Sequence, residues 1–208
     1  MHEQVNIFSS IAQPGEYTLK RTGNLPDDFA IIPDFISKAE EHELLRVIDL
    51  APWNQDMKRR VQHYGFRYDY KARAVSNRDR LGAIPDWALE IAQRLADCDY
   101  FAQVPDQVIV NEYEPGQGIS SHIDRTSCFG PTVASLSMGS DIVMDFSGDA
   151  GKSGAVLLPR RSMLIIRGAS RSSLRHSIAQ RRRDTINSET FTRSRRVSLT
   201  FRAVIVSD

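Results

Sequence analysis

The spacing of hydrophobic residues changes near residue 106 and divides the sequence into two parts. In the first part, Ser37 and Glu40 match a helix capping box, and the apolar residues after them have helical spacing until Pro52. A second helix is expected to begin at Pro85, with three apolar residues on one face: Trp87, Ile91 and Leu95. The first part is therefore predicted to contribute two amphipathic helices.

The rest of the first part is expected to form an arm and a ribbon. Residues 1–30 are polar with scattered Pro and Gly, which predicts an irregular arm with a short strand near Ala30–Ile32. Residues 57–75 are predicted to form a β-ribbon or lid because aromatic residues alternate along them. These aromatic residues are Tyr64, Phe66, Tyr68 and Tyr70.

After residue 106, short apolar runs alternate with Gly, Ser, Asp and Pro, which is typical of a sandwich or barrel of short strands. The expected strands are Val108–Tyr113, Val133–Ser137, Ile142–Phe146, Ala155–Leu158, Ser162–Arg167, Leu174–Ile178 and Val197–Val206. The interval Gln180–Ser194 is polar, basic and long for a hairpin loop, and such loops are usually functional or disordered. We therefore expect a mainly β fold with flanking helices.

Length and composition fit one globular domain over residues 1–208, with no repeat or linker. Residues 1–105 would form the arm, helices and lid, and residues 106–208 the β core. Two cysteines in 208 residues, no apparent signal peptide and no apolar run of membrane-spanning length favour a cytoplasmic, non-membrane protein. A monomer without an obligate protein partner is the simplest expectation.

The charge is divided unevenly along the chain. Residues 1–150 hold 14 Lys and Arg against 23 Asp and Glu, a net −9, whereas residues 151–208 hold 13 against 3, a net +10. Nearly all of the later positive charge is arginine, whose guanidinium binds phosphate and carboxylate through two hydrogen bonds. The C-terminal part therefore suggests a polyanionic partner, although a solubilising face would have the same composition.

His122 and Asp124 are two residues apart, so in an extended segment both side chains point to one side. With His176 near the start of a late strand, they would supply two imidazoles and one carboxylate. Non-haem Fe(II) oxygenases bind iron with this ligand set and keep the remaining positions open. Each histidine by itself is more often an ordinary surface or core residue.

The last expected strand carries Arg196 and Arg202, which are six residues apart and so share one face with Ser198 and Thr200. The opposite face is apolar. Arginines that point into a barrel are costly unless an anion pairs with them, and a small dicarboxylate would do so. The alternative is an edge strand with two solvated arginines.

These motifs together resemble the AlkB-type Fe(II)- and 2-oxoglutarate-dependent dioxygenases over about residues 60–206. The matching elements are Asn111-x-Tyr113, Pro115-Gly-x-Gly118-Ile, His122-x-Asp124, His176 and Arg196-x5-Arg202. The resemblance implies a double-stranded β-helix (jelly-roll) core with an N-terminal nucleotide-recognition lid. It implies that His122, Asp124 and His176 bind iron. It also implies that Asn111, Tyr113, Arg196 and Arg202, with Ser198 between the arginines, surround 2-oxoglutarate.

Details such as Leu158-Pro-Arg-Arg-Ser162 resemble the branch that contains the wobble-uridine tRNA hydroxylases and, nearby, bacterial repair enzymes. Repair members often have an acidic residue two positions after the iron-binding aspartate, where this chain has Thr126. The tRNA enzymes usually carry added domains that 208 residues cannot hold, which favours repair. The resemblance thus implies oxidative removal of N-methyl groups from DNA, and possibly RNA, with release of formaldehyde.

Three other functions remain open from the sequence: tRNA nucleoside hydroxylation, hydroxylation of a protein or small molecule, and nucleic-acid binding without catalysis. For either nucleic-acid reaction, a base must be flipped out or single-stranded. Tyr64 and Phe66 are expected to contact it, although alternate aromatics also simply pack sheets. Arg125 and Arg161 complete the expected substrate residues, and phosphate contacts are expected from Arg160, Arg161 and Arg181–Arg183.

Overall fold

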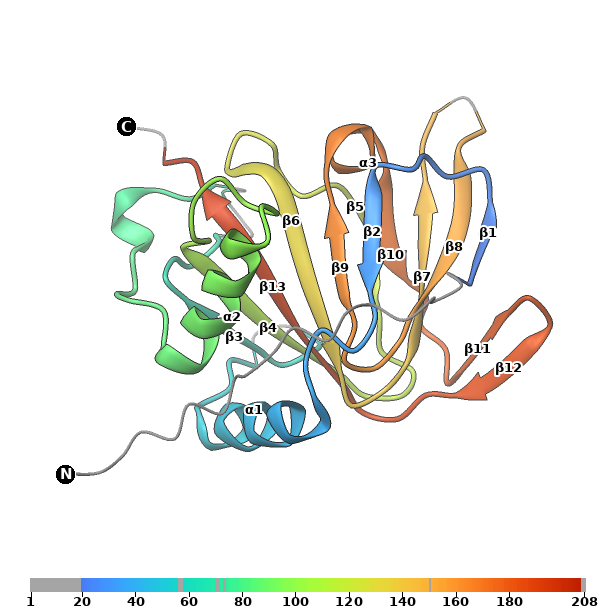
Figure 1. Cartoon of the computed structure of the whole chain (residues 1–208), viewed down its shortest axis with the longest axis horizontal. Helices are drawn as coiled ribbons and strands as arrows, with labels where there is room; N and C mark the ends of the chain where they lie inside the picture. Colours follow the sequence, from blue (N-terminus) through green and yellow to red (C-terminus); the bar gives the residue numbers. More distant parts are fainter. Residues whose placement is uncertain (1–19, 56–57, 70–71, 73, 150, 207–208) are drawn as a thin grey trace.

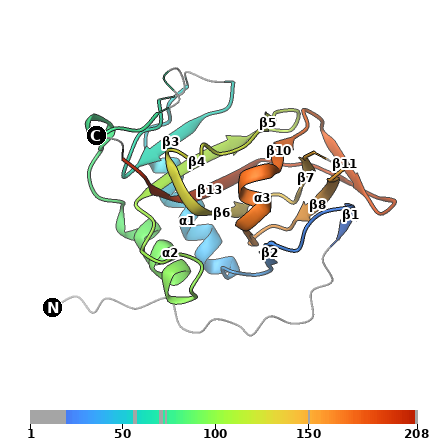
Figure 2. The same ribbon diagram turned by 90° about the horizontal axis from the view of Figure 1, so that it is seen from above.

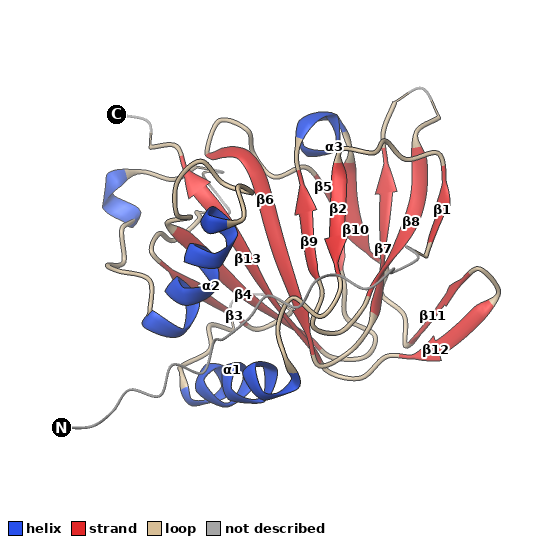
Figure 3. Cartoon of the chain, viewed as in Figure 1, coloured by secondary structure: helices blue, strands red, loops and turns tan. Residues whose placement is uncertain are grey.

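The computed structural model describes residues 20–55, 58–69, 72, 74–149 and 151–206. Two antiparallel sheets dominate the molecule, and the helices lie outside them (Figures 1 and 3). This arrangement confirms a mainly β fold with flanking helices and a double-stranded β-helix core. The expectations for residues 1–19 and for Tyr70 lie outside the described residues.

The larger sheet has six strands in the order β2-β9-β6-β13-β4-β3, and the smaller has five in the order β1-β8-β7-β10-β5. The bounds of the first set are β2 Phe29–Ile32, β9 Met163–Ile166, β6 Phe129–Met138, β13 Arg196–Val204, β4 Gln107–Tyr113 and β3 Val61–Tyr64. Those of the second set are β1 Arg21–Gly23, β8 Ser153–Leu158, β7 Ile142–Ser147, β10 Arg175–Ile178 and β5 Ile119–His122.

Helices α1 (Lys38–Leu50) and α2 (Asp86–Asp97) cover the outer face of the larger sheet (Figure 2). The expected capping box starts α1, because the Ser37 hydroxyl accepts from the Glu40 amide at 3.1 Å and the Glu40 carboxylate accepts from the Ser37 amide at 2.6 Å. Apolar side chains of both helices pack on residues of β4, β6, β9 and β13 in one core. In the described residues, no helix is long and apolar enough to cross a membrane.

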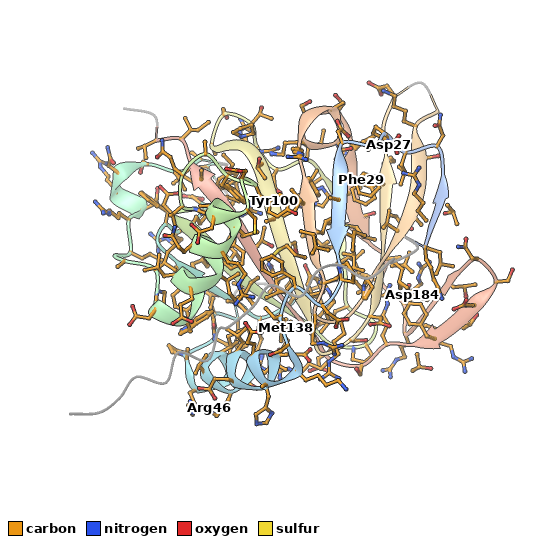
Figure 4. The ribbon with its side chains drawn as sticks, viewed as in Figure 1. Asp27, Phe29, Arg46, Tyr100, Met138 and Asp184 are labelled. Carbon is orange, nitrogen blue, oxygen red and sulfur yellow. The ribbon has the colours of Figure 1, made fainter. Side chains whose placement is uncertain are left out.

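A second core holds the two sheets together. Phe29 from β2, which is labelled in Figure 4, stacks on Phe146 from β7 with ring centroids 5.7 Å apart. The packing includes Leu164 and Ile166 from the larger sheet and Met144 from the smaller one. Met144, Leu164 and Ile166 also line a cavity between the sheets, so this core borders the site described below.

Residues 180–194 fold differently from the expected loop. They contain a hairpin of β11 (Arg183–Ile186) and β12 (Glu189–Thr192), whose turn residues Asn187 and Ser188 both have positive φ, as a tight hairpin turn requires. The hairpin is held by Asp184, a buried residue at its base that is labelled in Figure 4.

Other short elements also escaped prediction, namely β1, β5, the 3-10 turn η1 (Asn77–Asp79) and helix α3 (Gly168–Ser173). The predicted ribbon is only partly a strand. β3 ends at Tyr64, and isolated bridges Phe66–Arg80 and Asp69–Ala74 join the part that follows.

Candidate active site

A cavity of about 790 Å³ lies between the two sheets. One wall is formed by residues of β4, β6, β9 and β13, and the other by residues of β5, β7 and β10. The predicted residues that line it are Asn111, Tyr113, His122, Asp124, Arg125, His176, Arg196, Ser198 and Arg202. The structure therefore gathers all the proposed iron and 2-oxoglutarate residues in one place.

Strand β13 is central to the larger sheet, which excludes the edge-strand alternative. Its register pairs Arg196 with Tyr113 and Ser198 with Asn111 on the neighbouring β4. Because paired residues on adjacent strands point to the same face, these four side chains share the cavity wall. The alternate residues of β13 pack under the helices, so the parity argument from the sequence is correct.

His122 and His176 are direct partners on the paired strands β5 and β10, and their ring centroids are 4.3 Å apart. The Nε2 atom of His176 lies 3.9 Å from Oδ2 of Asp124. The two histidines and the carboxylate are thus neighbours, which argues against a non-catalytic protein in which His122 and His176 never meet.

The donor chemistry fits a divalent iron ion. The Nδ1 of His122 lies 2.8 Å from the Ser120 carbonyl oxygen, a hydrogen bond that leaves Nε2 for a metal. Burial lowers the pKa of His176 to about 4 although Asp124 opposes the shift, so its imidazole is neutral. Burial raises the pKa of Asp124, but the positive charges around it, Arg202 first, outweigh burial and keep the carboxyl ionised. Metal ligands need these protonation states.

The three side chains adjoin without converging on one point. Among the described residues, no group of three His, Cys, Asp or Glu side chains is already arranged to hold a metal. Adjacent ligands on an ion with bonds of about 2.1 Å lie about 3 Å apart. The 3.9 Å between His176 and Asp124 would therefore have to shorten by about 1 Å when an ion binds.

Arg196 is a buried cation that a bound anion would stabilise. Its side chain is 1% exposed, its Nη2 donates to the Ser137 hydroxyl at 2.8 Å, and its guanidinium lies 5.4 Å from the Tyr113 ring centre. Within the described residues no carboxylate pairs with it, and its Nε has no hydrogen-bond partner. Burial lowers its pKa to about 10. A carboxylate group of a ligand would satisfy this site.

Arg202 is already paired, unlike Arg196. Its Nη2 donates to Oδ1 of Asp124 at 2.7 Å, and its Nη1 donates to Gln107 at 3.2 Å. In this arrangement Arg202 orients the predicted iron ligand. Asn111 also has a partner that sequence reasoning missed, because its Oδ1 accepts from Nε of Arg59 at 2.9 Å.

Two of the expected aromatic contacts lie away from the cavity, and a third residue replaces them. Tyr64 packs edge-on against Trp87 with centroids 5.3 Å apart, and Phe66 belongs to a small core with Cys128. Tyr68 lines the cavity instead. Tyr64 pairs with Val108 and so lies on the helix-covered face of the larger sheet. The strand alternation does not continue past Tyr64, because β3 ends there and Gly65 has a φ of +76°.

Several expected phosphate-binding arginines are paired with carboxylates. Arg161 lies outside the cavity lining, 2.7 Å from Asp34 and 3.8 Å from Glu41, so the structure does not bring it to the site. Arg160 likewise pairs with Glu41, and Arg181 with Asp184. The cations that line the cavity outside its buried end are Lys58, Arg59, Arg125 and Arg175. Only Arg125 of these was predicted.

Comparison with known proteins gives consistent matches. The profile of the 2OG-Fe(II) oxygenase superfamily matches residues 28–202. The chain is 34% identical to the tRNA (carboxymethyluridine(34)-5-O)-methyltransferase ALKBH8 of Macaca fascicularis over 88% of this chain, but it spans only 29% of that protein. It is 30% identical to the probable RNA/DNA demethylase ALKBH6 of Danio rerio, covering 96% of this chain and 94% of that one.

The solved structure of OsALKBH1 has the same fold. It superposes with a TM-score of 0.65 at 18% sequence identity, over 89% of this chain and all of that chain.

Proposed function

Because this chain belongs to the 2OG-Fe(II) oxygenase superfamily, and within it resembles the AlkB-like proteins, we propose that it oxidises a carbon attached to a nucleic-acid base. It is a 2-oxoglutarate-dependent dioxygenase that uses Fe(II), 2-oxoglutarate and O2. The observation that supports the site assignment best is the cavity that joins two histidines and a carboxylate to a buried arginine, Arg196, with which no carboxylate of the described residues pairs.

In this proposal His122, Asp124 and His176 hold the iron, and Arg196 binds the distal carboxylate of 2-oxoglutarate. Asn111, Tyr113 and Ser198 line the wall between these two points. When bound, iron and 2-oxoglutarate activate O2 for insertion of one oxygen atom into a substrate C–H bond, with succinate and carbon dioxide as co-products. The residues of the cavity would orient 2-oxoglutarate and the substrate relative to the iron.

The cations at the rim of the cavity support a nucleic acid as the substrate. Lys58, Arg59, Arg125 and Arg175 line it, and no carboxylate forms an ion pair with any of them among the described residues. Such cations bind backbone phosphates without reading sequence. Tyr68 offers a ring on which a flipped or single-stranded base stacks.

The charges that line the cavity also indicate which charge the substrate base carries. Asp124 is the only carboxylate among the described lining residues, and it is committed to Arg202 and the proposed metal. An N-methyl base with a fixed positive charge would therefore meet cations and no free acid, whereas a neutral base would not be repelled. We therefore favour stable hydroxylation of a neutral base in RNA. The name of the macaque relative, a methyltransferase of a tRNA carboxymethyluridine, is in keeping with an RNA base that carries no positive charge.

Removal of N-methyl groups, the reaction expected in the sequence analysis, is the second candidate. The name of the zebrafish relative, a probable RNA/DNA demethylase that this chain matches over nearly its full length, supports it. Because the chain spans under a third of the macaque protein, that protein's whole activity does not transfer.

Mass spectrometry distinguishes the two reactions. The protein would be incubated with Fe(II), 2-oxoglutarate, isotopically heavy O2 and either transfer RNA or methylated DNA and RNA oligonucleotides. Heavy oxygen retained in a nucleoside supports hydroxylation, and formaldehyde with loss of a methyl group supports dealkylation. If His122→Ala gives the same product as the wild type, or if no nucleic acid is oxidised, the proposal is wrong.

A further inference from the structure

Arg171 is a buried arginine that joins the two segments carrying the proposed iron ligands. It lies in α3, five residues before His176, and is 4% exposed. Its Nη1 donates to the main-chain oxygen of Asp124, and its Nη2 donates to the main-chain oxygen of Phe129 at 3.4 Å. The guanidinium therefore spans both ends of the loop that follows His122-x-Asp124.

That loop is a tight turn with bonds of its own. The amides of Cys128 and Phe129 both donate to the Arg125 carbonyl, at 3.1 and 3.0 Å. These bonds close the turn, and the Cys128 carbonyl also accepts from the Ile205 amide at 2.8 Å, but none of these bonds reaches the segment that leads to His176. Arg171 provides a connection to the segment that continues into His176.

The surroundings of Arg171 do not explain it as an ordinary ion pair. Among the described residues no carboxylate lies within ion-pair distance of it, and its Nε has no hydrogen-bond partner. A buried guanidinium without a carboxylate is costly, and an apolar side chain of similar volume often packs as well. Its two main-chain acceptors are the contacts that a hydrophobic replacement could not reproduce.

Asp124 is consequently held by hydrogen bonds both at its side chain and at its main chain. Arg202 donates to its carboxylate at 2.7 Å, while Arg171 donates to its main-chain oxygen. We propose that Arg171 is a positioning residue, which holds the main chain of Asp124 near the segment of His176 so that only a short movement brings the two ligands together when the metal binds. This inference rests on the proposed ligand set.

A matched pair of variants tests the role. In Arg171→Met the side chain stays long and fills the buried space but donates no hydrogen bond. The control is Arg167→Met: Arg167 is exposed, directly precedes α3, and its guanidinium makes no hydrogen bond to a described residue. Mn(II) would be titrated into each apoprotein, with free Mn(II) followed by electron paramagnetic resonance and folding checked by circular dichroism.

Arg171→Met is expected to bind Mn(II) about 10- to 100-fold more weakly than the wild type, the usual cost of losing a group that orients a ligand. Arg167→Met should bind as the wild type does. Arg171→Lys keeps the charge but reaches only one carbonyl, so its affinity should be intermediate. If Arg171→Met does not fold, Arg171→Lys decides: severalfold weaker binding supports the role, and unchanged binding overturns it.

His122→Ala separates this inference from the ligand assignment. Mn(II) binding that is lost in His122→Ala but unchanged in a folded Arg171→Met variant would overturn the positioning role alone. Binding that survives in His122→Ala would refute the ligand set and the positioning role together.

Discussion

Replacing Arg196 with methionine is expected to stabilise the apoprotein and to weaken its binding of 2-oxoglutarate. Burial holds the pKa of Arg196 at about 10 instead of 12.5, which corresponds to about 3 kcal/mol of unfavourable free energy for the charged form. Methionine would remove that cost. It would also remove the hydrogen bond to Ser137 and the contact with the Tyr113 ring, each worth about 1 kcal/mol. The expected net gain is about 1 kcal/mol.

The effect on 2-oxoglutarate has the opposite sign. Losing one partner of a buried, hydrogen-bonded charge pair costs about 3 kcal/mol, which is about 100-fold in affinity. Urea denaturation of the apoprotein would measure the first quantity. Calorimetric titration of 2-oxoglutarate in the presence of Mn(II), without oxygen, would measure the second.

Arg195→Met is the matched control, because Arg195 is adjacent in sequence but lies outside the cavity lining and pairs with Glu112 and Asp49. It should destabilise the protein and leave 2-oxoglutarate binding unchanged. The reasoning is refuted if Arg196→Met binds 2-oxoglutarate within about threefold of the wild type, since a bound carboxylate pair should be worth far more. A loss of about 2 kcal/mol or more of stability would instead indicate a structural role for Arg196.

Three further outcomes are expected. Tyr68→Ala should weaken nucleic-acid binding by about 1–3 kcal/mol, whereas Tyr64→Ala should lower stability and leave binding intact; the reverse pattern of binding would show that Tyr64 is the stacking residue. Arg125→Ala should reduce the slope of log affinity against log salt by about 1, and an unchanged slope would exclude a phosphate contact. Burial raises the pKa of Asp184, but Arg193, the Val143 amide and Arg181 outweigh it and lower the pKa. Its stabilisation is therefore full above the unfolded pKa of about 4 and is lost as pH falls through the lower folded value. Asp184→Asn should lose about 3 kcal/mol at neutral pH and flatten this acid limb in urea melts; an unaltered acid limb would contradict the assignment.

The strand periodicity made much of the site predictable. Residues six apart on a strand share a face, which links Arg196 with Arg202 on β13. The same reasoning linked His122 with Asp124, although β5 ends at His122 and Asp124 follows in the loop. The late position of His176 then supplied a third ligand by its residue type. The structure adds that β5 and β10 are paired, which is why His176 lies opposite His122.

What the sequence did not reveal depends on contacts between distant segments. The alternation through Tyr64 and Phe66 suggested one face, but the positive φ of Gly65 breaks the strand and brings Tyr68 to the cavity. A count of basic residues likewise cannot distinguish Arg125, which lines the cavity, from Arg161, which is paired with Asp34. Such pairings join residues that are more than a hundred positions apart.

The hydrogen-bond partners of the buried arginines could not be predicted from the sequence either. Nothing in the sequence around Ser137 marks it as the acceptor for Arg196, and its register opposite Ser198 on β13 is visible only in the sheet. Arg171 lies between the expected strands Ser162–Arg167 and Leu174–Ile178, and neither α3 nor the hydrogen bond from Arg171 to Asp124 was expected.

Conversion of 2-oxoglutarate to succinate, with Fe(II) and oxygen, tests the central claim most directly. It would be measured with and without RNA or DNA for the wild type and for His122→Ala, Asp124→Ala and His176→Ala. The account predicts that the wild type forms succinate, that a nucleic acid stimulates the reaction, and that all three variants lose it. Turnover that persists in any folded variant, or that no nucleic acid stimulates, would contradict the account.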